Sequence, residues 1–430
     1  SIIEWDESYV ATIVKLPELS EVTWLDNLML ATVFGYNCLV GKDSNPDVPY
    51  VFFPAECELS PEFLSGNNLY KHSERNVDTT KKGFFDDNGR VRAVKFKGIV
   101  SSGFLIPQNS LRHFIKWVVD FDMDIWATFH SIDGVAICKK YRSPETVRKE
   151  KILAKMGIKK PIYANRVIPT QFRLHSSTPQ FLRFLADFKE GDKIVITEKL
   201  HGTSAVFSNA HTKRRLTFFQ KLFKRFGVPI EEKEYFPLYS SRTVIKNQDV
   251  NPNQDGGGYY WEDIWWVYAK LLEWKIEKGI TLYGEIVGYT PSGKYIQKGY
   301  TYGCDEWESK FYCYRITYTT PDGIVIEFTD SQIRQYCSLR SIDVVPLVNQ
   351  FNINWVDSTT SEQDKAKYII GNINIEVMCP LNDNKVPREG VVIRRDGQET
   401  YSAYKLKSQL FLTHETKAID DGTVDTEEAN

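Results

Sequence analysis

Short hydrophobic runs separated by turn-rich segments dominate the first hundred or so residues of the chain. Residues 9–14 and 91–96, for example, are rich in β-branched and aromatic side chains, and similar runs continue up to about residue 107. Runs of this length and composition are typical of strands. Many short strands within about 100 residues predict a small β-barrel or sandwich at the N-terminus.

Apolar residues recur at helical spacing in two places. The sequence SLRHFIKWVVDF at 110–121 predicts a helix that Ser110 could cap, and WEDIWWVYAKLLEWKIE at 261–277 predicts a second helix that ends near Gly279. Further apolar runs predict strands at 193–197, 281–287, 311–316, 322–328 and 390–395. The chain after about residue 170 is therefore expected to form a second domain that mixes strands and helices.

Three segments are marked by their charge. Residues 140–170 are basic and loop-like and contain Pro161 and Pro169, so we expect a domain boundary near 150–170. The sequence HTKRRLTFFQKLFKRF at 211–226 could form a basic amphipathic helix, which is either a solvated insertion or a surface that faces nucleic acid. Residues 416–430 are acidic with almost no apolar content, which predicts a frayed tail.

The composition limits the class of protein. The 430 residues are 42% hydrophobic and carry a formal net charge of −2, so any affinity for nucleic acid must come from local basic patches. The seven cysteines are scattered and form no CxxC pair, which predicts a reduced protein of the cytoplasm or nucleus without a zinc site. With no apolar run of 18 residues and no leader pattern, we expect no membrane partner.

One phosphate-binding motif is matched only in part. Residues 288–294, GYTPSGK, fit the GxxxxGK pattern of a phosphate-binding loop. Tyr295 follows where the pattern needs Ser or Thr for magnesium, and the next residues, YIQKGYTYG, do not resemble the start of a helix. We therefore do not interpret this segment as a phosphate-binding loop.

A distributed set of residues is chemically more informative. A lysine amine near another cation or a metal becomes a nucleophile, two glutamates can hold a divalent metal, and an aromatic face can stack on a purine. Two lysines that are two apart on a strand point the same way and can both reach a triphosphate. The chain presents these types in one order: Lys199, Glu285, the aromatic run 311–316, Glu389, and Lys405 with Lys407.

Together these residues could support attack of a lysine on the α-phosphate of a nucleotide, with pyrophosphate as the leaving group. Each one alone has an ordinary structural interpretation, such as a solvated lysine in a hairpin or a charge on an edge strand. Their joint occurrence, at spacings that fit one domain, favours the functional interpretation.

The order of these residues resembles the motifs of the covalent nucleotidyltransferases, which include polynucleotide ligases and messenger-RNA capping enzymes. The resemblance spans about residues 165–412. Glu198-Lys199-Leu200-His201-Gly202 is similar to motif I of RNA ligases and implies that Lys199 becomes the AMP-carrying lysine. DNA ligases and capping enzymes usually have Asp where this chain has His201.

The resemblance also implies roles for the remaining motif residues. Arg242 would contact the ribose or a phosphate, Glu285 the ribose, and Glu389 a metal ion. Lys405 and Lys407 would contact the α-phosphate and the leaving pyrophosphate, and Glu198, His201 and Gly202 would lie at the nucleotide. The family usually has Asp after its adenine-stacking ring, whereas Arg315 follows Tyr314 here, so the ring is Tyr314, which we favour, or Phe311.

The position of the extra sequence distinguishes the subfamilies. Only 23 residues (408–430) follow Lys407, whereas the strand-rich N-terminal region precedes the motifs. This arrangement resembles the Deinococcus/Naegleria-type RNA ligases, which carry an N-terminal oligonucleotide-binding (OB) domain. The implied fold class is α+β, with an OB-like β-barrel followed by an adenylyltransferase domain of antiparallel sheets flanked by helices. The expected divisions are an N-terminal domain 1–155, a linker 156–170, a transferase domain 171–415 and a tail 416–430.

The resemblance implies an ATP-dependent RNA ligase that uses Mg²⁺ or Mn²⁺. It would join a 3′-hydroxyl RNA end to a 5′-phosphate, at nicks in duplexes or ends bridged by a template strand, as RNA repair, and nothing demands more than a monomer. The alternatives are a DNA ligase or capping guanylyltransferase of the same superfamily, and a non-catalytic RNA-binding protein.

Overall fold

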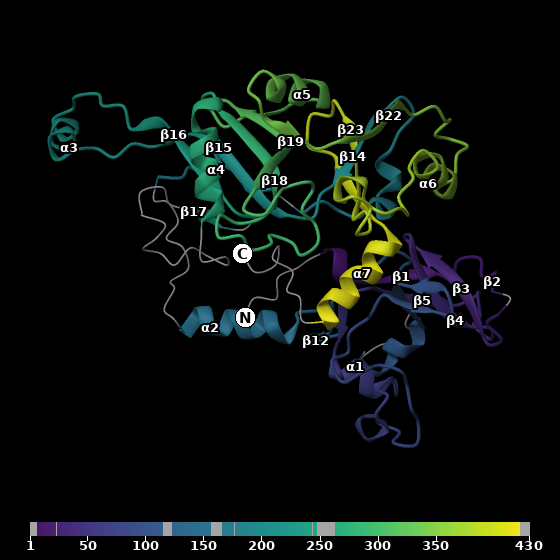
Figure 1. The fold of residues 1–430 in the computed structure, drawn as a ribbon. Coiled ribbons are helices and arrows are strands. Elements are labelled where there is room, and N and C mark those ends of the chain that lie inside the picture. The colour runs from purple at the N-terminus through teal and green to yellow at the C-terminus, as the bar shows by residue number, and fades with distance from the viewer. Residues whose placement is uncertain are drawn as a thin grey trace. The chain divides into compact units, whose positions relative to one another are not determined.

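The computed structural model describes residues 7–22, 24–114, 123–155, 166–175, 177–242, 244–246 and 263–421. Within these ranges the chain forms two compact units. The first unit combines residues up to 143 with 179–183 and 407–422, and the second comprises 144–178 and 184–406. Figure 1 shows the elements of both.

The first unit is built from small antiparallel sheets. A four-stranded sheet has the order β10-β1-β5-β9, with bounds Thr128–Phe129, Ala11–Lys15, Pro49–Pro54 and Gly103–Pro107. A three-stranded sheet follows the order β2-β3-β4, with bounds Ser20–Glu21, Leu28–Val33 and Tyr36–Gly41. Three two-stranded ladders pair β6 with β13, β7 with β8 and β11 with β12, with bounds Cys57–Leu59, Cys138–Lys140, Val94–Phe96, Ile99–Ser101, Ser131–Ile132 and Val135–Ala136.

Both faces of the four-stranded sheet are buried. Ile13 and Val51 contribute to one apolar cluster, whereas their strand neighbours Val14 and Phe52 contribute to another. Because successive residues of a strand point to opposite faces, continuous apolar runs are needed here rather than alternating ones. The ladders among the described residues form separate open sheets and do not show a closed barrel.

The second unit contains two sheets. The smaller has the order β22-β14-β23-β24, with bounds Leu347–Asn352, Lys193–Lys199, Gly390–Asp396 and Ala403–Lys407. The larger has the order β17-β16-β15-β18-β19-β20, with β21 pairing parallel to β19, and its bounds are Ile245–Lys246, Lys233–Ser240, Thr203–Lys213, Ile280–Gly288, Ser309–Thr319, Val325–Glu327 and Asp343–Val344. These strands confirm the predicted ones, although the strand expected at 322–328 is shorter.

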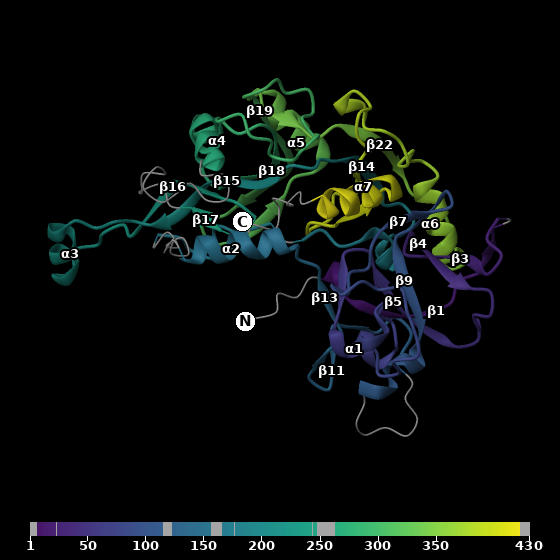
Figure 2. The same cartoon turned by 60° about the horizontal axis from the view of Figure 1, so that its bottom comes forward.

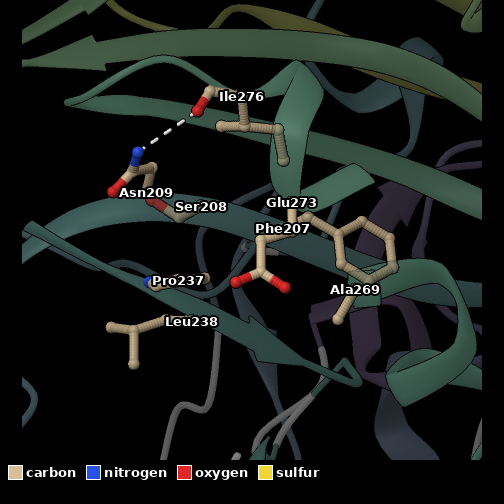
Figure 3. Close-up of a pocket in the computed structure, with 8 residues that line it drawn as sticks. All are labelled: Phe207, Ser208, Asn209, Pro237, Leu238, Ala269, Glu273 and Ile276. Atoms are coloured by element: carbon tan, nitrogen blue, oxygen red, sulfur yellow. Dashed lines mark hydrogen bonds between the residues drawn. The ribbon is translucent and has the colours of Figure 1, made fainter. Parts of the chain in front are cut away.

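Helices cover one face of the larger sheet (Figure 1). Helix α4 (Ile264–Leu272) begins at Asp263, whose side chain accepts the Trp266 N–H, and it packs with α5 (Asp330–Ser338) on apolar residues of β15, β18 and β19. A hollow of about 10 Å³ at this contact has room for one water molecule at most. The hollow is lined by Phe207, Ser208, Asn209, Pro237, Leu238, Ala269, Glu273 and Ile276, none of them a motif residue (Figure 3).

The other helices are divided between the two units. The remaining α-helices are α1 (Pro61–Gly66), α2 (Pro144–Lys155), α3 (Phe218–Arg225), α6 (Glu362–Ile370) and α7 (Gln409–Asp420). Short 3-10 helices lie at Glu7–Tyr9, Ser73–Arg75, Gln108–Phe114, Phe181–Arg183, Leu185–Asp187, Glu273–Lys275 and Pro380–Asn382. Among the described residues, no helix has the length and apolar content needed to span a membrane.

The structure corrects three predictions made from local sequence. The helix expected at 110–121 is a 3-10 helix, Gln108–Phe114, with Ser110 inside it and not at its cap, while 115–122 lie outside the described residues. The segment 140–170 is not entirely loop, because Pro144–Lys155 forms α2; residues 156–165 are not described. The frayed tail does not begin at 416, because α7 continues to Asp420 with Thr416 buried.

The helix expected at 261–277 is confirmed over α4 and the 3-10 helix that follows it. All seven cysteines are free and buried. Burial also raises the pKa of several of these thiols, including Cys38, Cys57 and Cys313, so they stay protonated.

Candidate active site

Lys199 ends β14, directly beside the start of β23. The antiparallel register pairs Lys199 with Gly390, so the residue before Gly390 comes within reach of the lysine side chain. Lys199 Nζ lies 2.7 Å from Glu389 Oε1, and the two side chains are only 16% and 1% exposed. The structure therefore joins the predicted motif I lysine and motif IV glutamate in one buried ion pair.

A second ion pair joins the two residues that precede Lys199 and Glu389 in the chain. Arg388 Nη2 is 2.7 Å from Glu198 Oε1, and both side chains are nearly buried. Burial raises the pKa of the Glu198 carboxyl, and the Arg388 charge opposes this effect. Sequence reasoning missed Arg388, although the Arg388-Glu389 and Glu198-Lys199 dipeptides carry complementary charges that could have indicated the pairing.

The turn after Lys199 passes close to β18. A Cβ atom on Gly202 would lie 2.3 Å from the Ile286 carbonyl oxygen, so only glycine fits at this position. His201 follows the same turn, and its Nδ1 lies 3.9 Å from Glu389 Oε2. The turn thereby carries the chain from the smaller sheet to the larger one beside Glu285.

Glu285 and Tyr314 lie close together on the larger sheet. Ser204 of β15 pairs with Glu285, and a register shift between Tyr283 and Gly284 leaves Tyr314 as the extra residue of β19. Burial, and then the charge of Glu285, raise the pKa of the Tyr314 hydroxyl well above its usual value. The Tyr314 ring also contacts His175 edge-on, with centroids 5.2 Å apart.

Phe311 has different surroundings. Its ring packs in the apolar core with Phe207 and Tyr268, at centroid distances of 5.1 and 6.1 Å, and the residue is 4% exposed. Gly284 makes this packing possible, because a Cβ atom there would lie 2.3 Å from the Phe311 ring. Of the two rings considered for adenine, Phe311 belongs to the helix-covered core, which favours Tyr314.

The remaining predicted residues lie on β24 or directly after β16. Arg242 follows β16 and donates to Ser177 Oγ at 2.9 Å. Lys405 and Lys407 lie on β24, in the same sheet as Lys199. Lys407 Nζ is 3.1 Å from Glu415 Oε1 of α7, so this lysine already has a carboxylate partner.

Glu389 has the chemistry of a metal ligand. Its Oε2 is buried and has no hydrogen-bond partner among the described residues. Carboxylate oxygens suit Mg²⁺ and Mn²⁺, and Mg²⁺ commonly binds through one or two carboxylates, substrate phosphates and waters. The described residues contain no cluster of three or more His, Cys, Asp or Glu ligands.

The buried pair of Lys199 and Glu389 brings together two residues of the motifs that resemble those of nucleotidyltransferases. The family model for RNA ligase matches residues 192–407, just over half of the chain. The chain therefore belongs to the RNA ligase family, and the predicted membership of that family is confirmed. No curated protein sequence matches the chain significantly.

Solved structures share the fold over nearly the whole length. A structure of Naegleria gruberi RNA ligase with pyrophosphate is 13% identical, has a TM-score of 0.55 and covers 95% of this chain and 98% of its own. A mutant of that ligase without ligand is 14% identical, with the same TM-score and coverage. Another mutant, with AMP and Mn, is 14% identical, has a TM-score of 0.52 and covers 94% and 98%. The predicted mixed fold with antiparallel sheets is confirmed.

Proposed function

We propose that this RNA ligase is ATP-dependent and joins a 3′-hydroxyl RNA end to a 5′-phosphate through AMP bound to Lys199. The observation that carries the proposal is the buried 2.7 Å pair of Lys199 Nζ and Glu389 Oε1. A lysine with a surface role would not need a carboxylate that is only 1% exposed. The Naegleria ligase structures with AMP, pyrophosphate and Mn support the choice of nucleotide and metal.

In the first step Lys199 Nζ attacks the α-phosphorus of ATP. A nitrogen–phosphorus bond forms, the bond from that phosphorus to the bridging oxygen breaks, and pyrophosphate leaves. Attack requires Lys199 to lose a proton, and Glu389 Oε1 is in position to accept it. Mg²⁺ or Mn²⁺ bound at Glu389 would neutralise phosphate charge.

The nucleotide would lie between the motif residues. Tyr314 would stack on adenine, Glu285 would accept a hydrogen bond from the ribose, and Arg242, Lys405 and Lys407 would hold the phosphates. Glu285 of β18 pairs with Ser204 of β15, which begins directly after the Lys199 turn, and Tyr314 lies on β19, the next strand beyond β18; this arrangement supports the placement. Lys407 would exchange Glu415 for pyrophosphate.

In the second step the 5′-phosphate of the RNA takes AMP from Lys199, and in the third the 3′-hydroxyl attacks that phosphate and releases AMP.

We propose nicks in duplexes or template-bridged ends as substrates, a role in RNA repair, and a monomer. We also propose that the strand-rich first unit has an OB-like fold and that a linker near 156–170 leads into the adenylyltransferase domain. Of the expected divisions 1–155, 156–170, 171–415 and 416–430, the last boundary falls inside α7. The seven free thiols support a reducing compartment.

Helix α3 supplies a surface for RNA. It begins at Thr217 with a capping box and lies at the end of a long extension of β15 and β16 (Figures 1 and 2). The exposed basic residues there are Lys213, Arg214, Arg215, Lys221, Lys224 and Arg225, and the exposed rings are Phe218, Phe219, Phe223 and Phe226. Basic side chains can bind phosphates and exposed rings can stack on unpaired bases, so we propose RNA as the partner.

The test is the intact mass of the protein after incubation with ATP and Mg²⁺. We expect one AMP per chain on Lys199, no adduct for Lys199→Ala, and a normal adduct for Lys193→Ala, which changes the other lysine of β14. A folded wild-type protein that forms no adduct with ATP or GTP would contradict the proposal, and RNA binding alone would favour a non-catalytic protein. An adduct only with GTP would favour a guanylyltransferase, and sealing of DNA nicks only would favour a DNA ligase.

A further inference from the structure

The connection between β18 and β19 is much longer than an ordinary hairpin loop. It spans residues 289–308 and includes most of the GYTPSGK segment, for which phosphate binding was rejected. Gln297, Tyr300 and Tyr302 of this loop are 4%, 1% and 5% exposed. Large polar side chains that are this deeply buried need hydrogen-bond partners, and these partners identify what the loop does.

One set of partners is the turn after Lys199. The His201 N–H donates to Tyr302 Oη at 2.7 Å, and Gln297 Nε2 donates to the Gly202 carbonyl at 3.1 Å. The Tyr300 ring packs edge-on against the His201 ring, with centroids 5.0 Å apart. The loop therefore contacts the backbone of both His201 and Gly202 and also the ring of His201.

The other set of partners precedes Glu389. Tyr300 Oη donates to the Pro387 carbonyl at 2.9 Å, and the Tyr302 N–H donates to Asn382 Oδ1 at 2.8 Å. Asn382 is itself 4% exposed. The same two tyrosines thus connect the turn after the nucleophile with the segment that leads into its carboxylate partner.

The backbone of Tyr302 is held in an unfavourable conformation. Its φ of +52° lies in the left-handed region, which bulky residues rarely adopt. The bond to Asn382 stabilises this conformation and keeps the phenol under the Lys199 turn. Burial, followed by the charge of Glu389, raises the pKa of Tyr302, so its oxygen stays neutral. A strained, buried residue beside a reactive pair indicates a functional constraint.

We propose that Gln297, Tyr300 and Tyr302 form a positioning bridge that sets Lys199 against Glu389 for attack on ATP. None of the three needs to contact the nucleotide for this role. The inference rests on the proposed function, because it concerns the rate of the first step. A nucleophile that is displaced by about 1 Å can lose about a hundredfold in rate, so small changes in the bridge should be measurable.

The test is the single-turnover rate of AMP transfer to Lys199 as a function of ATP concentration. Tyr302→Phe keeps the ring and removes the acceptor of the His201 N–H, and Tyr300→Phe removes the donor to Pro387. We expect each to lower the maximal rate by roughly tenfold, with the ATP concentration at half-maximal rate nearly unchanged. The matched control is Tyr295→Phe, in the same loop, whose ring is 47% exposed and packs on Tyr289.

A second measurement separates positioning from folding. RNA that already carries AMP on its 5′-phosphate bypasses Lys199, so Tyr302→Phe and Tyr300→Phe should seal it at close to the wild-type rate. Unchanged AMP transfer in both variants would overturn the bridge, and so would equal losses in AMP transfer and in sealing of the pre-activated RNA. If the wild-type protein forms no AMP–lysine, both the proposed function and the bridge are wrong. If the wild-type protein forms it and the variants do so equally fast, only the bridge is wrong.

Discussion

Adjacent residues of β14 take part in separate ion pairs at the candidate site. Successive residues of a strand point to opposite faces, so Lys199 meets Glu389 on one side and Glu198 meets Arg388 on the other. The Glu198–Arg388 pair keeps a second buried carboxylate away from the nucleophile. A contact of Glu198 with nucleotide stays a prediction, since its carboxylate already has a partner.

At the residue scale, Glu389→Gln should stop the first step while preserving the fold. The amide keeps the shape of the side chain but loses the charge that pairs with Lys199 and would bind a divalent cation. We expect AMP transfer to Lys199 to fall by about a hundredfold or more, with weak dependence on Mg²⁺ concentration. The measurement is a Mg²⁺ titration of the adduct-forming rate, with the exposed Glu399→Gln as control. Wild-type rates at every Mg²⁺ concentration would contradict the role of Glu389.

At the scale of elements, helix α3 presents two separated surfaces. One surface is apolar and consists of exposed phenylalanine and leucine side chains. The other surface is basic and carries Lys221, Lys224 and Arg225. Among the described residues no helix or strand shares an apolar cluster with these rings. The helix contains none of the motif residues, which permits a clean separation of RNA binding from AMP transfer.

Replacing Lys221, Lys224 and Arg225 together by serine should weaken RNA binding without affecting the first step. Loss of phosphate contacts is expected to lower affinity by roughly tenfold at physiological salt and to reduce its salt dependence. The measurement is RNA affinity across a salt series, beside AMP transfer. The control replaces the exposed lysines Lys189, Lys278 and Lys385 by serine. Equal RNA affinity of the α3 variant and wild type, or binding of α3 to anionic vesicles instead, would refute the RNA surface.

At the scale of the whole molecule, the C-terminal helix α7 belongs to the first unit. Arg90 is fully buried and donates to both oxygens of Glu56, at 2.7 and 2.8 Å, and Arg90 also pairs with Asp420 of α7. Thr416 of α7 donates to the same Glu56 at 2.7 Å. Residues that are more than 300 positions apart in the chain therefore share one buried network. The network holds α7, and β24, which carries Lys405, leads directly into that helix.

Arg90→Met should destabilise this unit strongly, because Glu56 would stay buried without its cation. We expect a loss of about 3–5 kcal/mol in the free energy of unfolding. Arg92→Met is the matched control, since Arg92 is 40% exposed and pairs with the same Asp420, and it should cost less than about 1 kcal/mol. Denaturant unfolding measures both. Equal effects of the two substitutions would show that the buried network does not stabilise the unit.

The sequence by itself predicted five strands of the second unit, the helix that contains 264–272 and the family. Those features depend on periodicity and on short motifs whose physical requirements lie within a few residues. The same local reasoning failed at 110–121, at α2 and at α7, because packing and the partners of Thr416 decided those segments. Sequence favoured Tyr314 but kept Phe311 as an alternative, because the register shift in β19 that gives the two rings different surroundings cannot be read from the sequence.

Only the tertiary structure decided which residues support the site. Arg388, Gln297 and Tyr302 carry no recognisable motif, and each acquires its role from a neighbour that is distant in sequence. Ion pairs and buried hydrogen bonds depend on which strands and loops lie side by side, and that is a property of the folded chain. The candidate reactive residues could therefore be proposed from the sequence, whereas the contacts that surround them required the fold.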